Sequence, residues 1–132
     1  MNATLTLSSL LAAALVATPA TAQQPGTLIA ADPLQETSPG TQAWKVRYIT
    51  RMDDGTPREV TGMVIAPREA IPARPRPVIA WAHGTWGTAE SCAPSLSPRF
   101  FELTPAVEAA RRGYVVVALD YPGLGSPGGH PY

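Results

Sequence analysis

Two apolar stretches decide the fold: Val78-Ile79-Ala80-Trp81-Ala82 and Tyr114-Val115-Val116-Val117-Ala118-Leu119. Each is short and almost continuously apolar, which is typical of a strand that is buried on both faces of a sheet. The segment between them carries a helix signal, with Thr104 as the N-cap, Pro105 at the first helical position and Gly113 just past the end. The order strand, loop, helix, strand predicts a βαβ unit whose two strands are parallel.

A β-hairpin is predicted to precede this unit. Residues 43–50 alternate aromatic or aliphatic with basic side chains, the period-two pattern of a half-buried strand. Asp53-Asp54-Gly55 predicts the turn, because Asp and Gly tolerate the positive φ that a chain reversal needs. Residues 59–66 would form the returning strand, and four prolines keep residues 67–77 at the surface. The fold class is therefore α/β, with an N-terminal hairpin plus one βαβ unit.

The two ends of the chain are predicted to lie outside this sheet. Residues 1–22 are typical of a cleaved export signal, because an apolar run of about 13 residues is followed by a small-x-small pattern that ends at Ala22. That run is shorter than the roughly 18 to 20 residues that span a bilayer, so no stable membrane span is expected. An uncleaved anchor and an ordinary N-terminal helix are the alternatives. Residues 23–42 are predicted to be extended and poorly ordered, and residues 121–132 to be a loop. The expected location is secreted or periplasmic.

The composition excludes several classes of function. The 132 residues carry 10 Lys+Arg and 10 Asp+Glu, and the basic residues are scattered rather than gathered into the stripe that binds nucleic acid. A hydrophobic fraction of 45% is too high for a disordered chain. Cys92 is the single cysteine, so the chain forms neither an internal disulfide nor a multi-cysteine zinc site. No metal site and no cofactor are predicted.

The candidate site is His83-Gly84-Thr85, at the end of the first apolar strand. Ligands of α/β sheets bind beyond the carboxyl ends of parallel strands, and a glycine there lets backbone N–H groups turn toward a developing oxyanion. The alternative, which the tripeptide alone favours, is a plain strand-terminating turn with a packed His83. Residues 123–128 fit the Gly-x-Gly-x-x-Gly pattern of dinucleotide sites, but Pro127 and Pro131 oppose the helix that such a site requires.

Residues 113–125, Gly-Tyr-Val-Val-Val-Ala-Leu-Asp-Tyr-Pro-Gly-Leu-Gly, resemble the helix end, fourth strand and following loop of the α/β-hydrolase family. In that family the preceding strand ends in a His-Gly motif that forms part of the oxyanion hole, as His83-Gly84 would here. Residues 91–95 and 128–132 look like the secretory lipase branch. The resemblance implies that residues 43–132 are the N-terminal part of a hydrolase domain. The family's strand order is 1-2-4-3-5, of which this chain would hold strands 1, 2, 4 and 3. Strand 3, residues 78–82, would then lie at the edge of the sheet with unpaired backbone groups.

The resemblance implies a carboxylic ester hydrolase that acts through an acyl-serine intermediate on a small-molecule or lipid ester. The backbone N–H of Thr85 would be the catalytic oxyanion donor. His83, Gly84 and Trp86 would be substrate-binding, with Trp86 lining the acyl pocket. Cys92 matches a cysteine that such lipases pair with a downstream partner, and it is therefore a disulfide candidate whose partner is not in this sequence.

The catalytic triad is where the sequence departs from the family. The family needs a serine in Gly-x-Ser-x-Gly, then an acid, then a histidine, in that chain order. No serine here has that context, and His130 comes too early to be the final histidine. Asp120 and Tyr121 match positions with a structural role. The resemblance therefore implies a chain that lacks nucleophile, acid and histidine and is inactive alone, its partner being the missing C-terminal half of the domain.

The rival interpretation is a small secreted binding domain without catalytic activity. Its candidate ligand contacts are Trp44, Trp81 and Trp86. Trp81 lies inside an apolar run, so packing in the core is the favoured role for that side chain.

Overall fold

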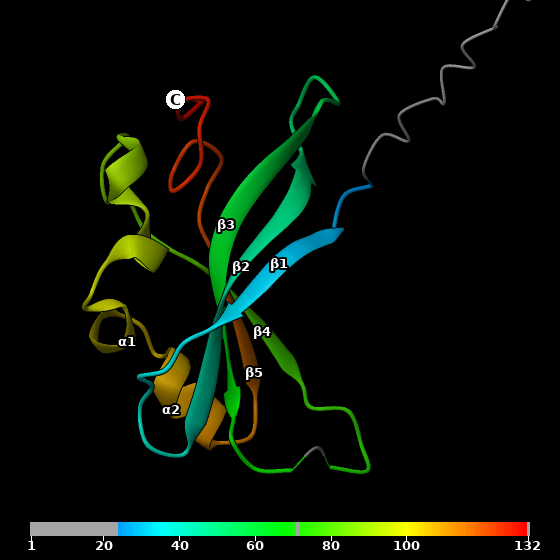
Figure 1. Ribbon diagram of the computed structural model, residues 1–132, viewed down its shortest axis with the longest axis vertical. Coiled ribbons are helices and arrows are strands. Elements are labelled where there is room, and N and C mark those ends of the chain that lie inside the picture. The colour runs from blue at the N-terminus through cyan, green and yellow to red at the C-terminus, as the bar shows by residue number, and fades with distance from the viewer. Residues whose placement is uncertain (1–23, 71, 132) are drawn as a thin grey trace, which may run out of the picture.

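The computed structural model describes residues 24–70 and 72–131, which form a five-stranded mixed sheet with its helices gathered on one side (Figure 1). The export signal predicted for residues 1–22 lies outside the described residues. The strands are β1 (Leu28–Pro33), β2 (Thr41–Arg51), β3 (Pro57–Pro67), β4 (Val78–Ala82) and β5 (Val115–Leu119). The helices are the 3-10 turns η1 (Glu90–Cys92) and η2 (Pro94–Leu96) and the α-helices α1 (Phe100–Leu103) and α2 (Ala106–Arg111).

The strand order in the sheet is β1-β2-β3-β5-β4. Only β4 and β5 pair in parallel, and every other neighbouring pair is antiparallel. The βαβ unit is thereby confirmed, with β4 and β5 as its strands and α2 on the connection. The predicted order 1-2-4-3 is also confirmed, since it corresponds to β2-β3-β5-β4.

β1 corrects the expectation of poor order for residues 23–42. Leu28–Pro33 pairs antiparallel with β2, with Ala31 opposite Val46, and Gly26 N–H donates to the Ile49 carbonyl at 2.7 Å. The ladder exists because β2 is 11 residues long and begins at Thr41, so its outer edge offers a long row of free backbone groups.

The predicted hairpin is confirmed, and Asp54 and Gly55 close it. β2 and β3 pair along their whole lengths, from Thr41 opposite Pro67 to Arg51 opposite Pro57. Gly55 has φ +83°, the left-handed conformation that glycine adopts most easily. The Asp54 carboxylate accepts from the Thr56 hydroxyl at 2.6 Å and from the Thr56 N–H at 2.9 Å. These bonds hold the pKa of Asp54 below its usual value.

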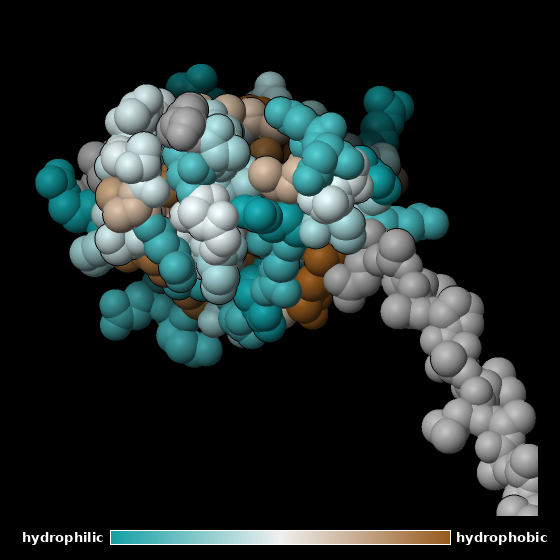
Figure 2. Space-filling view, turned by 90° about the horizontal axis from the view of Figure 1, so that it is seen from above, coloured by the Kyte–Doolittle hydropathy of each residue, from teal (hydrophilic) through white to brown (hydrophobic). Residues whose placement is uncertain are grey.

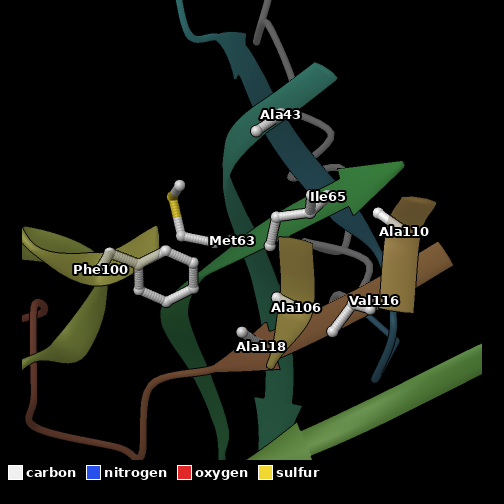
Figure 3. Close-up of a cluster of buried hydrophobic side chains, with 8 residues drawn as sticks. All are labelled: Ala43, Met63, Ile65, Phe100, Ala106, Ala110, Val116 and Ala118. Carbon is white, nitrogen blue, oxygen red and sulfur yellow. The ribbon is translucent and has the colours of Figure 1, made fainter. Parts of the chain in front are cut away.

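The hydrophobic core lies between the sheet and α2 (Figure 3). Met63 and Ile65 project from β3 on the same face, because residues two apart in a strand point the same way. Ala106 and Ala110 of α2 are fully buried, and their small side chains let the helix approach the strands closely. The core residues are Ala43, Met63, Ile65, Phe100, Ala106, Ala110, Val116 and Ala118.

Helix α2 begins one residue later than predicted. Ala106 is its first residue and Pro105 takes the N-cap position. The Thr104 hydroxyl nevertheless accepts from the Ala106 N–H at 3.2 Å, which is the capping bond expected of Thr104. Gly113 follows the helix with φ +97° and donates to the Ala110 carbonyl, as predicted for a helix C-terminus.

β4 confirms the edge position that the resemblance implies for residues 78–82, whereas the burial on both faces that the apolar run indicates is not observed. It is an edge strand, and Val78 is 65% exposed while Ile79 is 38% exposed. No strand lies along its outer side in the described part of the chain, and only Trp81 packs against the core. Apolar patches also reach the surface at the end of the molecule seen in Figure 2, between largely hydrophilic side chains.

Candidate functional site

The carboxyl ends of β4 and β5 bring the candidate residues together. Ala82, the last residue of β4, lies opposite Leu119, the last residue of β5. His83 and Asp120 therefore leave the sheet side by side, at the edge where α/β proteins bind their ligands. The structure places His83-Gly84-Thr85 at the position that the sequence predicts.

His83 is held on several sides. Its side chain is only 4% exposed, and its Nδ1–H donates to the Gly84 carbonyl at 2.6 Å. The Tyr121 hydroxyl donates to the His83 carbonyl at 2.9 Å, and the two rings lie 4.3 Å apart between centroids. Since a carbonyl only accepts, Nδ1 carries the proton, which leaves Nε2 buried with no hydrogen-bond partner among the residues that the structure describes. His83 is thus a packed histidine that also shapes the turn.

The backbone N–H groups of Gly84 and Thr85 stay outside the ladder. Both residues are exposed, and neither N–H has a hydrogen-bond acceptor within residues 24–70 and 72–131. Gly84 does not adopt a positive φ, so its backbone conformation is open to other residues. A Cβ at Gly84 would meet no atom within 4 Å. A side chain at position 84 would therefore meet open space, and the turn does not require a glycine for its backbone conformation.

Trp86 lies on the wall of a surface cavity next to the turn. The cavity has a volume of about 370 Å³, and Trp86 is 37% exposed there. Cys92 is a free, half-buried thiol whose Sγ lies 2.6 Å from where a Cβ of Gly87 would be. Gly87 also has φ +113°, so the chain turns sharply between Trp86 and η1. Besides Trp86, the main lining residues are Ser91, Cys92, Leu96, Ser97 and Pro98.

Asp120 organises a buried hydrogen-bond cluster that the sequence does not reveal. Its Oδ2 accepts from the Thr61 hydroxyl at 2.6 Å and from the Ser95 hydroxyl at 2.5 Å. Its Oδ1 accepts from the Ser95 N–H at 3.1 Å, and Asp120 itself is 3% exposed. The carboxylate therefore joins β3, β5 and η2, consistent with a structural role. The only sequence signal was an aspartate directly after a buried strand.

The predicted loop at residues 121–131 is confirmed, and it folds back on the strand ends. The Gly125 N–H donates to the Glu90 carbonyl at 2.8 Å, and Arg58 donates to the Gly128 carbonyl at 3.0 Å. The His130 ring lies parallel to Tyr121 at 6.2 Å, and its Nδ1–H donates to the Pro122 carbonyl at 2.8 Å. These contacts give His130 a structural place beside Tyr121.

The three tryptophans lie on different surfaces. Trp81 packs edge-on against Phe100, with centroids 6.3 Å apart, at the margin of the core. Trp44 follows the core residue Ala43 in β2, so it points to the opposite face of the sheet, where it lines a second cavity. Trp86 lines the cavity beside η1. The structure does not unite the three into one binding surface, as the rival interpretation would need.

Within the described ranges, His, Cys, Asp and Glu form no group of three or more that could hold a metal ion. None of the helices in that part of the chain has the length and apolar character needed to cross a membrane.

The fold is shared with solved structures of esterases and lipases. Against the rice cell wall degrading esterase LipA from Xanthomonas oryzae, the TM-score is 0.58 at 23% sequence identity, over 76% of this chain and 30% of that one. Against Candida antarctica lipase A in its closed state, the TM-score is 0.60 at 22% identity, over 75% of this chain and 26% of that one. The chain has part of the α/β-hydrolase fold.

This chain spans less than a third of the length of each of these two enzymes. At this identity the likeness establishes the fold, and function has to be argued from the site. No protein-family profile matches the chain, and no curated protein matches its sequence.

Proposed function

We propose that this chain supplies the oxyanion-hole loop and the first strands of a carboxylic ester hydrolase that acts through an acyl-serine intermediate. The observation that carries the proposal is the Thr85 N–H, which lies beyond the carboxyl end of β4 and has no acceptor among the described residues. A donor of this kind stabilises the negative charge that develops on an ester carbonyl as the serine attacks. We further propose export from the cytoplasm and a small-molecule or lipid ester as substrate.

In this arrangement each predicted site residue has a distinct task. Thr85 donates through its backbone, and the open space above Gly84 admits the ester carbonyl. Trp86 offers an exposed indole on the wall of the neighbouring cavity, where part of the substrate would rest. The attacking serine, its acid and its histidine would come from sequence outside the 132 residues. We therefore expect the 132-residue chain alone to show no turnover of a p-nitrophenyl ester above a heat-denatured control.

The proposal is tested first on the DNA that follows codon 132. An open frame that encodes Gly-x-Ser-x-Gly within about 60 residues supports a hydrolase, whereas a stop codon with no remnant of that motif favours the binding domain.

The second test uses the product of such a frame. Thr85→Pro removes the N–H, and we expect it to lower kcat by roughly 100-fold to 1,000-fold. Thr85→Ala keeps the N–H and is the matched control, with kcat close to that of the parent enzyme. Equal activity of the two variants would overturn the role of the Thr85 backbone.

A further inference from the structure

We propose that His83 and Tyr121 are positioning residues that together fix the direction of the Gly84 and Thr85 N–H groups. The inference deepens the proposed function and rests on it for its catalytic meaning. The structural part of the proposal concerns the two consecutive peptide planes that carry these N–H groups. It can be tested on the 132-residue chain itself.

The first peptide plane is fixed by the His83 imidazole. Its Nδ1–H donates to the Gly84 carbonyl at 2.6 Å, so that carbonyl is held on the side of the His83 ring. The peptide between Gly84 and Thr85 is trans and planar, so its N–H points opposite to its carbonyl. The Thr85 N–H is consequently directed away from the imidazole, toward the exposed side of the turn.

The second plane is fixed by the Tyr121 hydroxyl. It donates to the His83 carbonyl at 2.9 Å, which belongs to the peptide that carries the Gly84 N–H. The Gly84 N–H therefore also points away from its fixed carbonyl. The carbonyls of residues 83 and 84 are thus both held by side chains. The Gly84 and Thr85 N–H groups, by contrast, have no acceptor in the described ranges.

Both clamping rings are themselves held in place. His83 is buried, and its ring is tilted by 36° against the Tyr121 ring, with 4.3 Å between centroids. On Tyr121, the His130 ring lies nearly parallel, at 6°. Tyr121 directly follows Asp120, whose N–H donates to the Thr61 carbonyl at 3.0 Å. The residue that carries the Tyr121 ring is therefore anchored to β3 through the backbone of its neighbour Asp120.

The first experiment is NMR spectroscopy on the 132-residue chain, in a Val78→Lys background that removes an exposed apolar side chain from the β4 edge. Long-range ¹H–¹⁵N spectra should show His83 as the neutral Nδ1–H tautomer. In Tyr121→Phe, the Gly84 and Thr85 amide resonances should shift, because the peptide planes that carry them lose a fixed direction. Tyr114→Phe, which alters an exposed tyrosine directly before β5, is the matched control and should leave them unchanged. An Nε2–H tautomer, or Gly84 and Thr85 resonances that are identical in Tyr121→Phe and the parent, would overturn the inference.

The second experiment measures ester hydrolysis by the product of a longer reading frame. Tyr121→Phe and His83→Leu should lower kcat by about 10-fold to 100-fold with KM nearly unchanged, as expected when a group acts on the transition state through positioning. His83→Asn keeps an N–H donor near the Nδ1 position and should recover most of the lost kcat. An active enzyme in which Tyr121→Phe leaves kcat unchanged contradicts the positioning role alone. A product without any esterase activity contradicts the proposed function, and the NMR result then stands by itself.

Discussion

The Ser95 hydroxyl donates to the Asp120 carboxylate at 2.5 Å, across 25 positions of sequence and within the buried interior. This bond fastens the segment that follows the His83-Gly84-Thr85 turn to the end of β5. Because Thr61 donates to the same carboxylate oxygen, three separate segments converge on one charge. The geometry at the carboxyl ends of β4 and β5 therefore depends on Asp120, to which we assign no catalytic role.

Asp120→Asn should destabilise the fold by about 1 to 3 kcal/mol, because the amide NH₂ would face donors that then lose their acceptor. Asp120→Ala should cost more, since the Thr61 and Ser95 hydroxyls would both remain buried without an acceptor. Urea denaturation followed by circular dichroism measures the difference. Asp53→Asn, at an exposed turn position, is the control and should lie within about 0.5 kcal/mol of the parent. Equal midpoints for Asp120→Asn and Asp53→Asn would contradict the cluster's structural role.

Gly123→Ala should prevent folding or cost more than about 3 kcal/mol, from backbone strain together with steric overlap. Gly123 has φ +81°, and a Cβ there would lie 2.0 Å from the Gly129 carbonyl oxygen, which is backbone and cannot rotate away. Gly129→Ala is the matched control. Its φ of +68° carries similar strain, but the added methyl meets no atom within 4 Å, so a loss of about 1 to 2 kcal/mol is expected. Thermal melts of the two variants separate overlap from strain, and equal losses would show that overlap is unimportant.

Tyr48→Phe should remove part of the loss of stability at alkaline pH. Burial, and then the negative charge of Asp120, raise the pKa of Tyr48 above its ordinary value of 10.0. The folded state thus favours the neutral phenol, while the unfolded chain ionises first. The stability that the neutral Tyr48 phenol contributes to the folded state is fully present below pH about 10, and it is lost as the pH rises through the raised pKa. Denaturation curves at pH about 8 and about 11 should differ less for Tyr48→Phe than for the parent. Tyr114→Phe keeps Tyr48 and should retain the parent's pH dependence.

Val78→Lys should reduce self-association of the chain. The β4 edge exposes unpaired backbone groups together with Val78, which is 65% exposed, and edges of this kind template strand pairing between molecules. Sedimentation velocity should show concentration-dependent association for the parent and a monomer for the variant. Leu96→Lys also places a charge at an exposed apolar position, but away from the edge, and should associate like the parent. If both variants were monomeric, the added charge would act through general solubility rather than by blocking strand pairing at the β4 edge.

Local patterns predicted most of the sheet. The hairpin followed from alternation in β2 and from the turn at Asp53-Asp54-Gly55, and the β4–β5 pair followed from two apolar runs that flank a capped helix. β1 was missed because its only pairing is with β2, so its order comes from a partner strand rather than from its own short sequence. For β4, the apolar run by itself predicts burial on both faces, whereas the strand order implied by the resemblance predicts the exposed edge, because exposure depends on which neighbours surround a strand.

The candidate turn was predicted in place but not in detail. An apolar strand that ends in His-Gly located the site, since the carboxyl end of a parallel strand is where ligands bind. The bonds from Tyr121 to the His83 carbonyl and from Ser95 to Asp120 join residues 38 and 25 positions apart. Such contacts depend on the register of separate strands and on loop packing, which no local pattern encodes.

The free flank of β4 has a geometric consequence for any chain that extends this sheet. A strand that runs along it in the same direction as β4 would finish beside Gly84, about 4.8 Å away across the ladder. Whatever residue follows that strand would arrive within reach of an ester carbonyl bound at the Thr85 amide. The outer side of β4 and the proposed reaction centre are thus adjacent. A segment that extends the sheet along β4 would therefore also bring its own side chains to that centre.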